Sequence, residues 1–370
     1  MHEDNQLIYF WQNILEKAIS NQASDIHIEP DNGLSRIRLR VDGELKHIAT
    51  SPQQWHEQIC TRIKILSKLD ISERRLPQDG QMRIDINHQI VDCRTSTLPT
   101  LQGEKVVIRL LNNNEDELDI TQLGFNPKQL SDLKNALEQA QGFILVTGPT
   151  GSGKTQTLYS CIKYLRDSSK NINTIEDPIE IQLDGIQQVT INEKSGLSFD
   201  RALRAMMRQD PDVIMVGEIR DPITAETAFK AAETGHLVLS TLHANDAPSA
   251  LWRLRHLGLS TDNLANNLSC ITAQRLVRLI CPHCANKSLQ KTEISFSCSY
   301  CLDCGFKGRT AIHQVMPLSE SIRELIESNA PLSDINKQCA IEDIKTLRES
   351  ASHLIASGIS SAKEIYRHIA

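Results

Sequence analysis

Two patterns of apolar and polar positions divide the chain. In its first third, apolar and polar side chains alternate along Ser24–Glu29 and Arg36–Val41. This alternation is typical of half-buried β-strands. Before these strands, the apolar spacing of Leu7–Ile19 predicts a helix. We therefore expect residues 1–111 to form a small α+β domain.

The pattern changes after a polar, acidic stretch, which we place in a linker at residues 112–120. From about residue 121, short apolar runs alternate with helical stretches, which is typical of βαβ units around a parallel sheet. Parallel strands end along one edge of their sheet, where ligands bind, so the polar residues that follow each run are expected to face one site. The runs are Phe143–Thr147, Ile172–Ile175, Val213–Val216 and Leu237–Thr241.

The composition narrows the class of protein. Aromatic residues make up 4% of the 370 residues and the net charge is −6, which argues against direct nucleic-acid binding. The N-terminus is acidic, and no apolar run approaches the roughly 20 residues of a membrane-spanning helix. We therefore expect a cytoplasmic chain, in which thiols stay reduced and clustered cysteines favour a metal over disulfides.

One segment has the pattern of a nucleotide-phosphate loop between a strand and a helix. Backbone N–H groups of such a glycine-rich turn surround phosphates at a helix N-terminus. We expect Lys154 to reach the β- and γ-phosphates and the Thr155 hydroxyl to bind Mg²⁺. The segment is Gly148, Pro149, Thr150, Gly151, Ser152, Gly153, Lys154 and Thr155.

Acidic residues and a histidine follow the other strands of this sheet. Glu218 could orient the attacking water or hold magnesium through a water, although an acidic residue after a strand often caps a helix instead. Glu176, Asp177 and Glu180 form a second acidic cluster suited to magnesium or to positioning a water. His243 could hydrogen-bond the γ-phosphate. The sequence leaves their separate roles open.

Taken together, these motifs resemble the ATPases of type II secretion and type IV pilus assembly, over about residues 20–370. The resemblance implies an α/β protein with a RecA-like P-loop ATPase domain and a small α+β (PAS-like) N-terminal domain. A C-terminal zinc-binding and helical subdomain would follow. The segments that carry the resemblance are Ser24–Glu29, Arg38–Gly43, Leu76–Gly80, Arg94–Thr100, Gly148–Thr155, Thr174–Glu180, Arg208–Asp221 and Thr234–His243.

The resemblance also implies site roles. The family is hexameric, with its site between the N-terminal and ATPase domains. Glu218 would be the catalytic acidic residue of an atypical Walker B strand, and Glu180 the key carboxylate of the acidic box, residues Thr174–Glu180. Alternation alone predicts that the arginines of Arg36–Val41 face solvent, but in this family N-terminal arginines approach the phosphates. Candidates for that role are Arg38, Arg40, Arg94 and Arg109.

A cysteine-rich segment matches the zinc site of assembly-type members. Two Cys-x-x-Cys pairs separated by a short loop fit a closed tetrahedral zinc site. A fifth cysteine, Cys304, leaves the ligand set open, and we prefer Cys301 over it. The expected ligands are Cys281, Cys284, Cys298 and Cys301.

Together with the motifs, the resemblance implies an ATP-hydrolysing hexameric motor that powers assembly of a pilus or pseudopilus for type II secretion, type IV pili or competence, with ATP, Mg²⁺ and Zn²⁺. It would act on pilin-like subunits indirectly, through a polytopic inner-membrane platform protein to which it binds peripherally. The docking domain that precedes this region in many secretion members is expected to be absent. Within the chain we expect an ATPase core at 121–280, a zinc-binding insertion at 281–304 and a helical subdomain at 305–370. Alternatives are a retraction motor, a non-hydrolysing nucleotide-binding scaffold and a nucleic-acid translocase.

Overall fold

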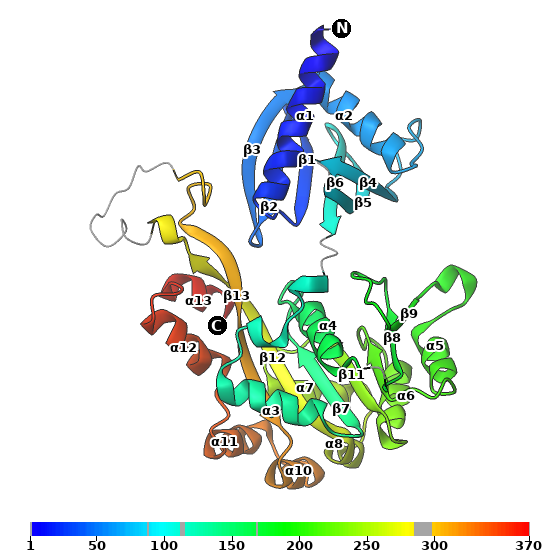
Figure 1. Cartoon of the computed structure of the whole chain (residues 1–370), viewed down its shortest axis with the longest axis vertical. Helices are drawn as coiled ribbons and strands as arrows, with labels where there is room; N and C mark the ends of the chain where they lie inside the picture. Colours follow the sequence, from blue (N-terminus) through cyan, green and yellow to red (C-terminus); the bar gives the residue numbers. More distant parts are fainter. Residues whose placement is uncertain (1, 87–88, 112–114, 168, 285–297, 370) are drawn as a thin grey trace. The chain divides into compact units, whose positions relative to one another are not determined.

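The computed structural model describes residues 2–86, 89–111, 115–167, 169–284 and 298–369. The chain separates into two compact units, Met1–Asn113 and Asn114–Ala370, which are described one at a time (Figure 1). Part of the predicted linker lies outside the described residues. Leu118 and Ile120, which end it, are buried in the core of the second unit.

The first unit is built on an antiparallel sheet with the strand order β3-β2-β1-β6-β5-β4. Helices α1 (His2–Ser20) and α2 (Gln53–Leu66) pack on it and touch each other through Phe10 and Trp55, whose ring centroids lie 5.2 Å apart. The strands are β1 (Asp25–Asp31), β2 (Leu34–Val41), β3 (Glu44–Pro52), β4 (Gln78–Ile86), β5 (Gln89–Thr100) and β6 (Gly103–Leu111).

Strand β2 shows why alternation fixes the two faces of this sheet. Ile37 and Leu39 are fully buried, whereas Arg36, Arg38 and Arg40 alternate with them and stay partly or fully accessible. Successive side chains of a strand point to opposite faces, so the arginines share the face that the core does not use. The predicted α+β character of this region is present in the structure.

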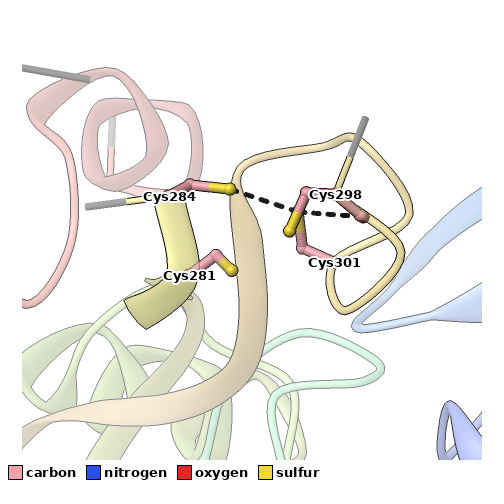
Figure 2. Close-up of side chains that lie close together, drawn as sticks. All are labelled: Cys281, Cys284, Cys298 and Cys301. Atoms are coloured by element: carbon pink, nitrogen blue, oxygen red, sulfur yellow. Dashed lines mark hydrogen bonds between the residues drawn. The ribbon is translucent and has the colours of Figure 1, made fainter. Parts of the chain in front are cut away.

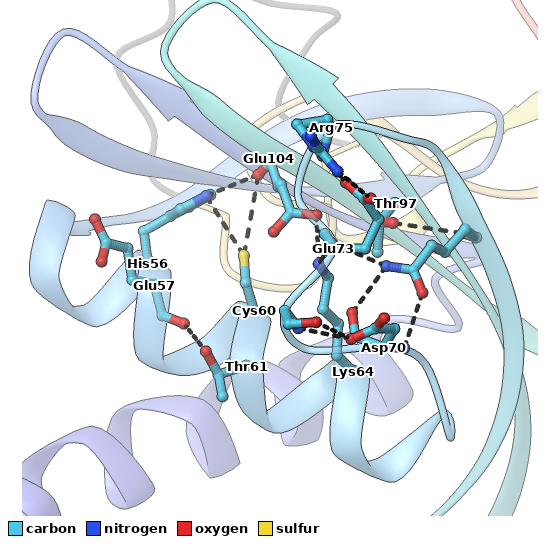
Figure 3. Close-up of polar contacts among 12 residues, drawn as sticks. His56, Glu57, Cys60, Thr61, Lys64, Asp70, Glu73, Arg75, Thr97 and Glu104 are labelled. Carbon is cyan, nitrogen blue, oxygen red and sulfur yellow. Dashed lines mark hydrogen bonds and ion pairs between the residues drawn. The ribbon is translucent and has the colours of Figure 1, made fainter.

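Helix α2 carries a buried polar network between itself and the sheet (Figure 3). The Lys64 ammonium is almost inaccessible, lies 2.6 Å from a Glu104 carboxylate oxygen and donates to the Glu73 carbonyl at 2.7 Å. His56 contacts the Glu104 carbonyl at 2.8 Å and the Ser35 hydroxyl at 2.9 Å. Because a buried charge must be paired, this network fixes how α2 docks on the sheet.

The second unit is built around a sheet with the order β13-β12-β7-β11-β10-β8-β9. All its strands are parallel except β13, which runs antiparallel to β12. This arrangement confirms the predicted α/β class with a parallel central sheet. The strands are β7 (Gly142–Thr147), β8 (Ile172–Glu176), β9 (Gln187–Thr190), β10 (Val213–Val216), β11 (Leu237–Leu242), β12 (Leu268–Ile280) and β13 (Phe306–Pro317).

Helices cover both faces of this sheet (Figure 1). Phe143 and Leu145 of β7 enter one core with residues of α5 to α8 and of the C-terminal helices, and Ile144 and Val146 enter the other core with α3 and α4. The helices are α3 (Pro127–Leu137), α4 (Lys154–Leu165), α5 (Phe199–Met206), α6 (Pro222–Glu233), α7 (Ala247–His256), α8 (Thr261–Asn267), α10 (Glu320–Glu327), α11 (Leu332–Ile341), α12 (Leu347–Ala356) and α13 (Ala362–His368). Short 3₁₀ turns are η1 (Glu115–Glu117), η2 (Ile120–Gln122) and η3 (Glu193–Ser195). Within the described residues, no helix has the length and apolarity needed to cross a bilayer.

A buried histidine predicts how acid affects this unit. His313 on β13 stacks on Phe125 with ring centroids 3.6 Å apart, its Nε2 donates to the Leu123 carbonyl at 2.8 Å, and burial lowers its pKa to about 4. The unfolded chain, with an ordinary histidine pKa, binds the proton first, so the free energy of unfolding falls as the pH drops below about 6.5. Between pH 7 and 5 we expect wild type to lose about 2 kcal/mol more than His313→Phe, measured by urea unfolding.

The control is the exposed His353. His353→Gln should follow the wild-type pH dependence. Equal pH dependence of wild type and His313→Phe would contradict the assignment of this effect to His313.

Candidate nucleotide site and metal centre

The polar segments after the parallel strands meet at one edge of the second sheet. Thr147, at the end of β7, pairs in register with Leu242 of β11 and with Ala273 of β12. Val216 of β10 pairs with Ser240 on one side and Ile175 on the other. The phosphate loop, the acidic box, Glu218 and His243 therefore follow strands that end at the same edge.

The loop between β7 and α4 is shaped by two glycines. A Cβ on Gly148 would lie 2.5 Å from the Gln274 carbonyl oxygen and 2.6 Å from Ser152 Oγ, closer than real Cβ atoms approach. Gly153, the residue before α4, has φ +89°, a left-handed conformation that glycine adopts at little cost. Pro149, Thr150 and Gly151 between them are exposed. The loop thus leaves its backbone open at the N-terminus of α4, which is where an anion binds favourably.

Lys154 and Thr155 begin helix α4 beside this loop. The Lys154 ammonium donates to the carbonyls of Gly148 and Pro149 at 2.9 and 3.0 Å. Burial lowers the pKa of Lys154, and the nearby Glu218 carboxylate opposes that shift. Thr155 is exposed at the first turn, and the buried Ser152 Oγ has no hydrogen-bond partner among the described residues. A triphosphate with magnesium fits this open loop, lysine and threonine hydroxyl.

Glu218 follows β10 and is held by an arginine. Its carboxylate forms an ion pair with Arg220, which also lies 4.0 Å from Asp177 of the acidic box. The main chain on either side of Glu218 is tied to neighbouring strands, because Gly217 N–H donates to the Ile175 carbonyl at 2.8 Å and Ile219 N–H to the Thr241 carbonyl at 3.1 Å. The Glu218 side chain is one quarter exposed, so water can reach it.

The acidic box separates into a buried and an accessible part. Glu176 is buried and accepts hydrogen bonds from Tyr159, from Thr174 Oγ1 at 2.6 Å and from Gln188 Nε2 at 3.1 Å. The Tyr159 hydroxyl in turn accepts from the Glu180 N–H at 3.0 Å. Glu176 therefore anchors the box to α4, whereas Asp177 is exposed and Glu180 is intermediate in exposure.

His243 lies at the end of β11 on the same edge. It is exposed, so its ring is accessible to a ligand at this edge. The hydroxyl of Thr241, two residues earlier, donates to the Gly217 carbonyl at 2.7 Å. This bond joins the strand that precedes His243 to the segment that carries Glu218.

Four cysteines come together just after the C-terminal end of β12 (Figure 2). The sulfurs of Cys281, Cys284, Cys298 and Cys301 all lie within 4.8 Å of one another, and those of Cys284 and Cys301 are 3.7 Å apart. A tetrahedral site with Zn–S bonds near 2.3 Å has sulfurs about 3.8 Å apart. The cluster therefore has the size and donor set of a closed zinc site.

The fifth cysteine of the segment has other contacts. The Cys304 thiol donates to the carbonyls of Cys301 and Phe306 at 2.9 and 3.1 Å. Cys301 is instead buried in the cluster, and its sulfur accepts from the Gly305 N–H at 3.4 Å. This geometry favours Cys301 as the ligand. The loop 285–297 between the two pairs lies outside the described residues.

Residues 1–367 match the family described as Type II/IV secretion system protein. The chain belongs to this family. A protein transport protein HofB homolog of Escherichia coli (strain K12) is 44% identical over 365 residues, which cover 95% of this chain and 79% of that protein. A type IV pilus assembly ATPase PilB of Acinetobacter baylyi is 41% identical over 388 residues, covering 99% of this chain and 67% of PilB. The crystal structure of the pilus retraction motor PilT with bound ADP is 26% identical and has a TM-score of 0.66 over 96% of both chains.

Family membership and the fold make this chain an ATPase related to pilus assembly and type II secretion ATPases. In this secretion ATPase the four N-terminal arginines belong to one face of the first sheet. Arg40 and Arg109 flank Asp25 in register, at 3.5 and 3.1 Å from its carboxylate, and Arg94 pairs with Arg109 on the next strand. Three of them therefore form one row across the sheet.

Arg38 lies one step along the same face, opposite His27. It donates to both Glu29 carboxylate oxygens at 2.8 Å. Burial alone would raise the pKa of Glu29, but hydrogen bonds from Arg38 and Lys105 outweigh it and lower the pKa to about 2. The structure describes this face within the first unit, and its approach to phosphates stays a prediction.

Three residues around the secretion ATPase site were not predicted. Tyr159 joins α4 to the acidic box, Arg220 holds Glu218, and Gln274 on β12 contacts the phosphate loop. Tyr159 lies just after the phosphate-loop segment and Arg220 inside the segment Arg208–Asp221, so their positions were the available signal, whereas Gln274 lies outside these segments. β12 runs parallel to β7 and brings Gln274 level with the phosphate loop, but its pairing depends on tertiary structure. Arg275 follows it and donates to the Asn245 carbonyl at 2.8 Å.

Proposed function

We propose that this chain is a hexameric motor that hydrolyses Mg-ATP to drive assembly of a pilus or pseudopilus. The observation that carries the proposal is the meeting, at one sheet edge, of an open phosphate loop with Lys154 and of a water-accessible carboxylate, Glu218. Lys154 and the loop N–H groups bind the phosphates, and Thr155 holds Mg²⁺. Glu218 orients the attacking water, and Glu180 supports the same site from the acidic box.

Additional groups complete the proposed site. His243 contacts the γ-phosphate from the end of β11. Arginines on the first sheet neutralise charge on the phosphates, which is the role that such residues have in other phosphoryl-transfer enzymes. Candidates for this role are Arg38, Arg40, Arg94 and Arg109. The four-cysteine cluster holds a structural Zn²⁺, which closes the segment between β12 and β13.

Assembly rather than retraction is favoured by sequence. The assembly ATPase PilB is 41% identical over nearly the whole chain, whereas the retraction motor PilT is 26% identical. We propose that the ring works in the cytoplasm and binds peripherally to a polytopic platform protein of the inner membrane. Pilin-like subunits are then moved indirectly, without direct contact with nucleic acid.

Deletion of the gene in its source cell tests the direction of the motor. Loss of an assembly motor removes surface filaments, because subunits are no longer inserted, and electron microscopy counts them. Complementation with wild type should restore filaments, and complementation with Lys154→Ala should not. Longer or more numerous filaments after deletion would contradict the proposal and favour the retraction alternative. Complementation by Lys154→Ala would contradict any role that needs bound nucleotide, whereas complementation by Glu218→Gln, which keeps nucleotide binding but loses turnover, would favour the non-hydrolysing scaffold.

A further inference from the structure

Gln274 occupies an unusual position beside the phosphate loop. It lies on β12, directly after Ala273, which pairs in register with the last residue of β7, Thr147. The side chain is 1% exposed. A buried amide needs partners for both its oxygen and its nitrogen, because a buried polar atom without a hydrogen bond keeps the full cost of its desolvation.

Both ends of the Gln274 amide are satisfied by the nucleotide-binding segment. Its Nε2 donates to the main-chain carbonyl of Ser152, inside the loop, at 2.7 Å. Its Oε1 accepts from the Thr157 hydroxyl, on the buried face of α4, at 2.9 Å. The two bonds connect one strand to the loop and to the helix that follows it.

The main chain of Gln274 also touches the loop. Its carbonyl oxygen lies 2.5 Å from the place a Cβ would take on Gly148, and its Nε2 lies 3.2 Å from the corresponding place on Gly153. The first and last glycines of the loop therefore both approach this residue closely. The phosphate loop therefore packs directly against strand β12.

We propose that Gln274 is a positioning residue for ATP hydrolysis. It holds the loop so that its backbone N–H groups converge on the phosphates, and it acts through the loop without touching the nucleotide. Preorganised donors stabilise charge because they need no rearrangement when the ligand binds. This inference rests on the proposed role of the loop as the phosphate site.

Replacement by leucine removes both hydrogen bonds at nearly constant volume. Gln274→Leu leaves the Ser152 carbonyl and the Thr157 hydroxyl without their partner, so the loop is no longer fixed. In the full-length chain we expect its Kd for a fluorescent ADP analogue to rise about tenfold, which corresponds to one buried hydrogen bond. Amide hydrogen exchange in the loop should accelerate, and KM for ATP should rise.

The control is Gln314 on the neighbouring strand. It is also buried, and its Oε1 accepts from the Ala247 N–H at 3.0 Å, a partner at the start of α7 and not in the loop. Gln314→Leu should lower thermal stability to a similar degree without changing the Kd for the ADP analogue. This contrast separates loss of positioning from general loss of stability.

Thr157→Val tests half of the arrangement in a variant that keeps the Ser152 bond. It should raise the Kd for the ADP analogue by a smaller factor than Gln274→Leu, and it also serves if that variant does not fold. An unchanged Kd in a folded Gln274→Leu chain, or in Thr157→Val where the first does not fold, would overturn the proposal. An equal rise of the Kd for the ADP analogue in Gln314→Leu would overturn the proposal too. The Kd is measured at equilibrium and does not depend on turnover. Absence of turnover in the wild type would therefore contradict the proposed motor function but not the positioning role of Gln274.

Discussion

Glu218→Gln is expected to reduce kcat for ATP hydrolysis by about 10²–10⁴, the usual contribution of a positioned acid or base. The amide keeps the size of the carboxylate but lacks the charge that polarises the attacking water. Nucleotide affinity should change little, because Lys154 and the loop still bind the phosphates. Steady-state phosphate release and equilibrium binding of a fluorescent ATP analogue measure the two quantities separately.

The control for this variant is another glutamate of the second unit. Glu226 lies exposed on α6, and Glu226→Gln should keep wild-type turnover. The opposite pattern to Glu218→Gln is expected from Lys154→Ala, which should lose nucleotide binding. If Glu218→Gln retained most of its turnover, the attacking water would have to be oriented by another group, and the acidic box residue Glu180 would be the next candidate.

The second large effect is expected on zinc content and stability when a zinc ligand is replaced. Cys281 is fully buried at the end of β12, and Cys281→Ser should reduce zinc content from about one ion per chain to near zero. Zinc binding contributes its free energy directly to folding, about 10–16 kcal/mol in isolated zinc-finger peptides. We therefore expect a clear loss of thermal stability in this variant. Elemental analysis and thermal melting with and without a chelator measure both effects.

Cys304 provides the matched control. Its thiol donates to two carbonyls instead of entering the cluster, so Cys304→Ser should keep its zinc while Cys301→Ser loses it. The reverse result would replace Cys301 by Cys304 in the ligand set. Retention of zinc in Cys281→Ser would contradict the four-cysteine site altogether.

The parallel sheet could be predicted from sequence because its strands are short, continuous apolar runs. Phe143–Thr147 and Val213–Val216 are buried on both faces and end abruptly in polar residues, and they became β7 and β10. Strands of a parallel sheet end along the same edge, so their order was not needed to place the phosphate loop and Glu218 together. The family resemblance then assigned roles that the residues alone left open.

Other parts of the site depended on contacts between distant segments. In the sequence, the acidic box contains three similar carboxylates. In the structure, Glu176 is buried and accepts a hydrogen bond from Tyr159, whereas Asp177 is exposed. Nothing in the local pattern distinguishes them, since burial is set by the packing of α4 against β8. Likewise, no local pattern around Gln314 indicates a partner for its side chain, yet its Oε1 accepts a hydrogen bond from the Ala247 N–H at the start of α7.

The sequence by itself determined the class of the sheet, the phosphate loop, the acidic residues after its strands and the cysteine pairs, because these features are local patterns of spacing and polarity. The tertiary structure decided which strand lies beside the loop and hence that Gln274 braces it. It also decided that Arg220 holds Glu218 and that the Cys304 thiol contacts main-chain carbonyls and is not one of the four clustered sulfurs. Such contacts join residues brought together by strand pairing and helix packing, and the energy that selects them comes from the whole core.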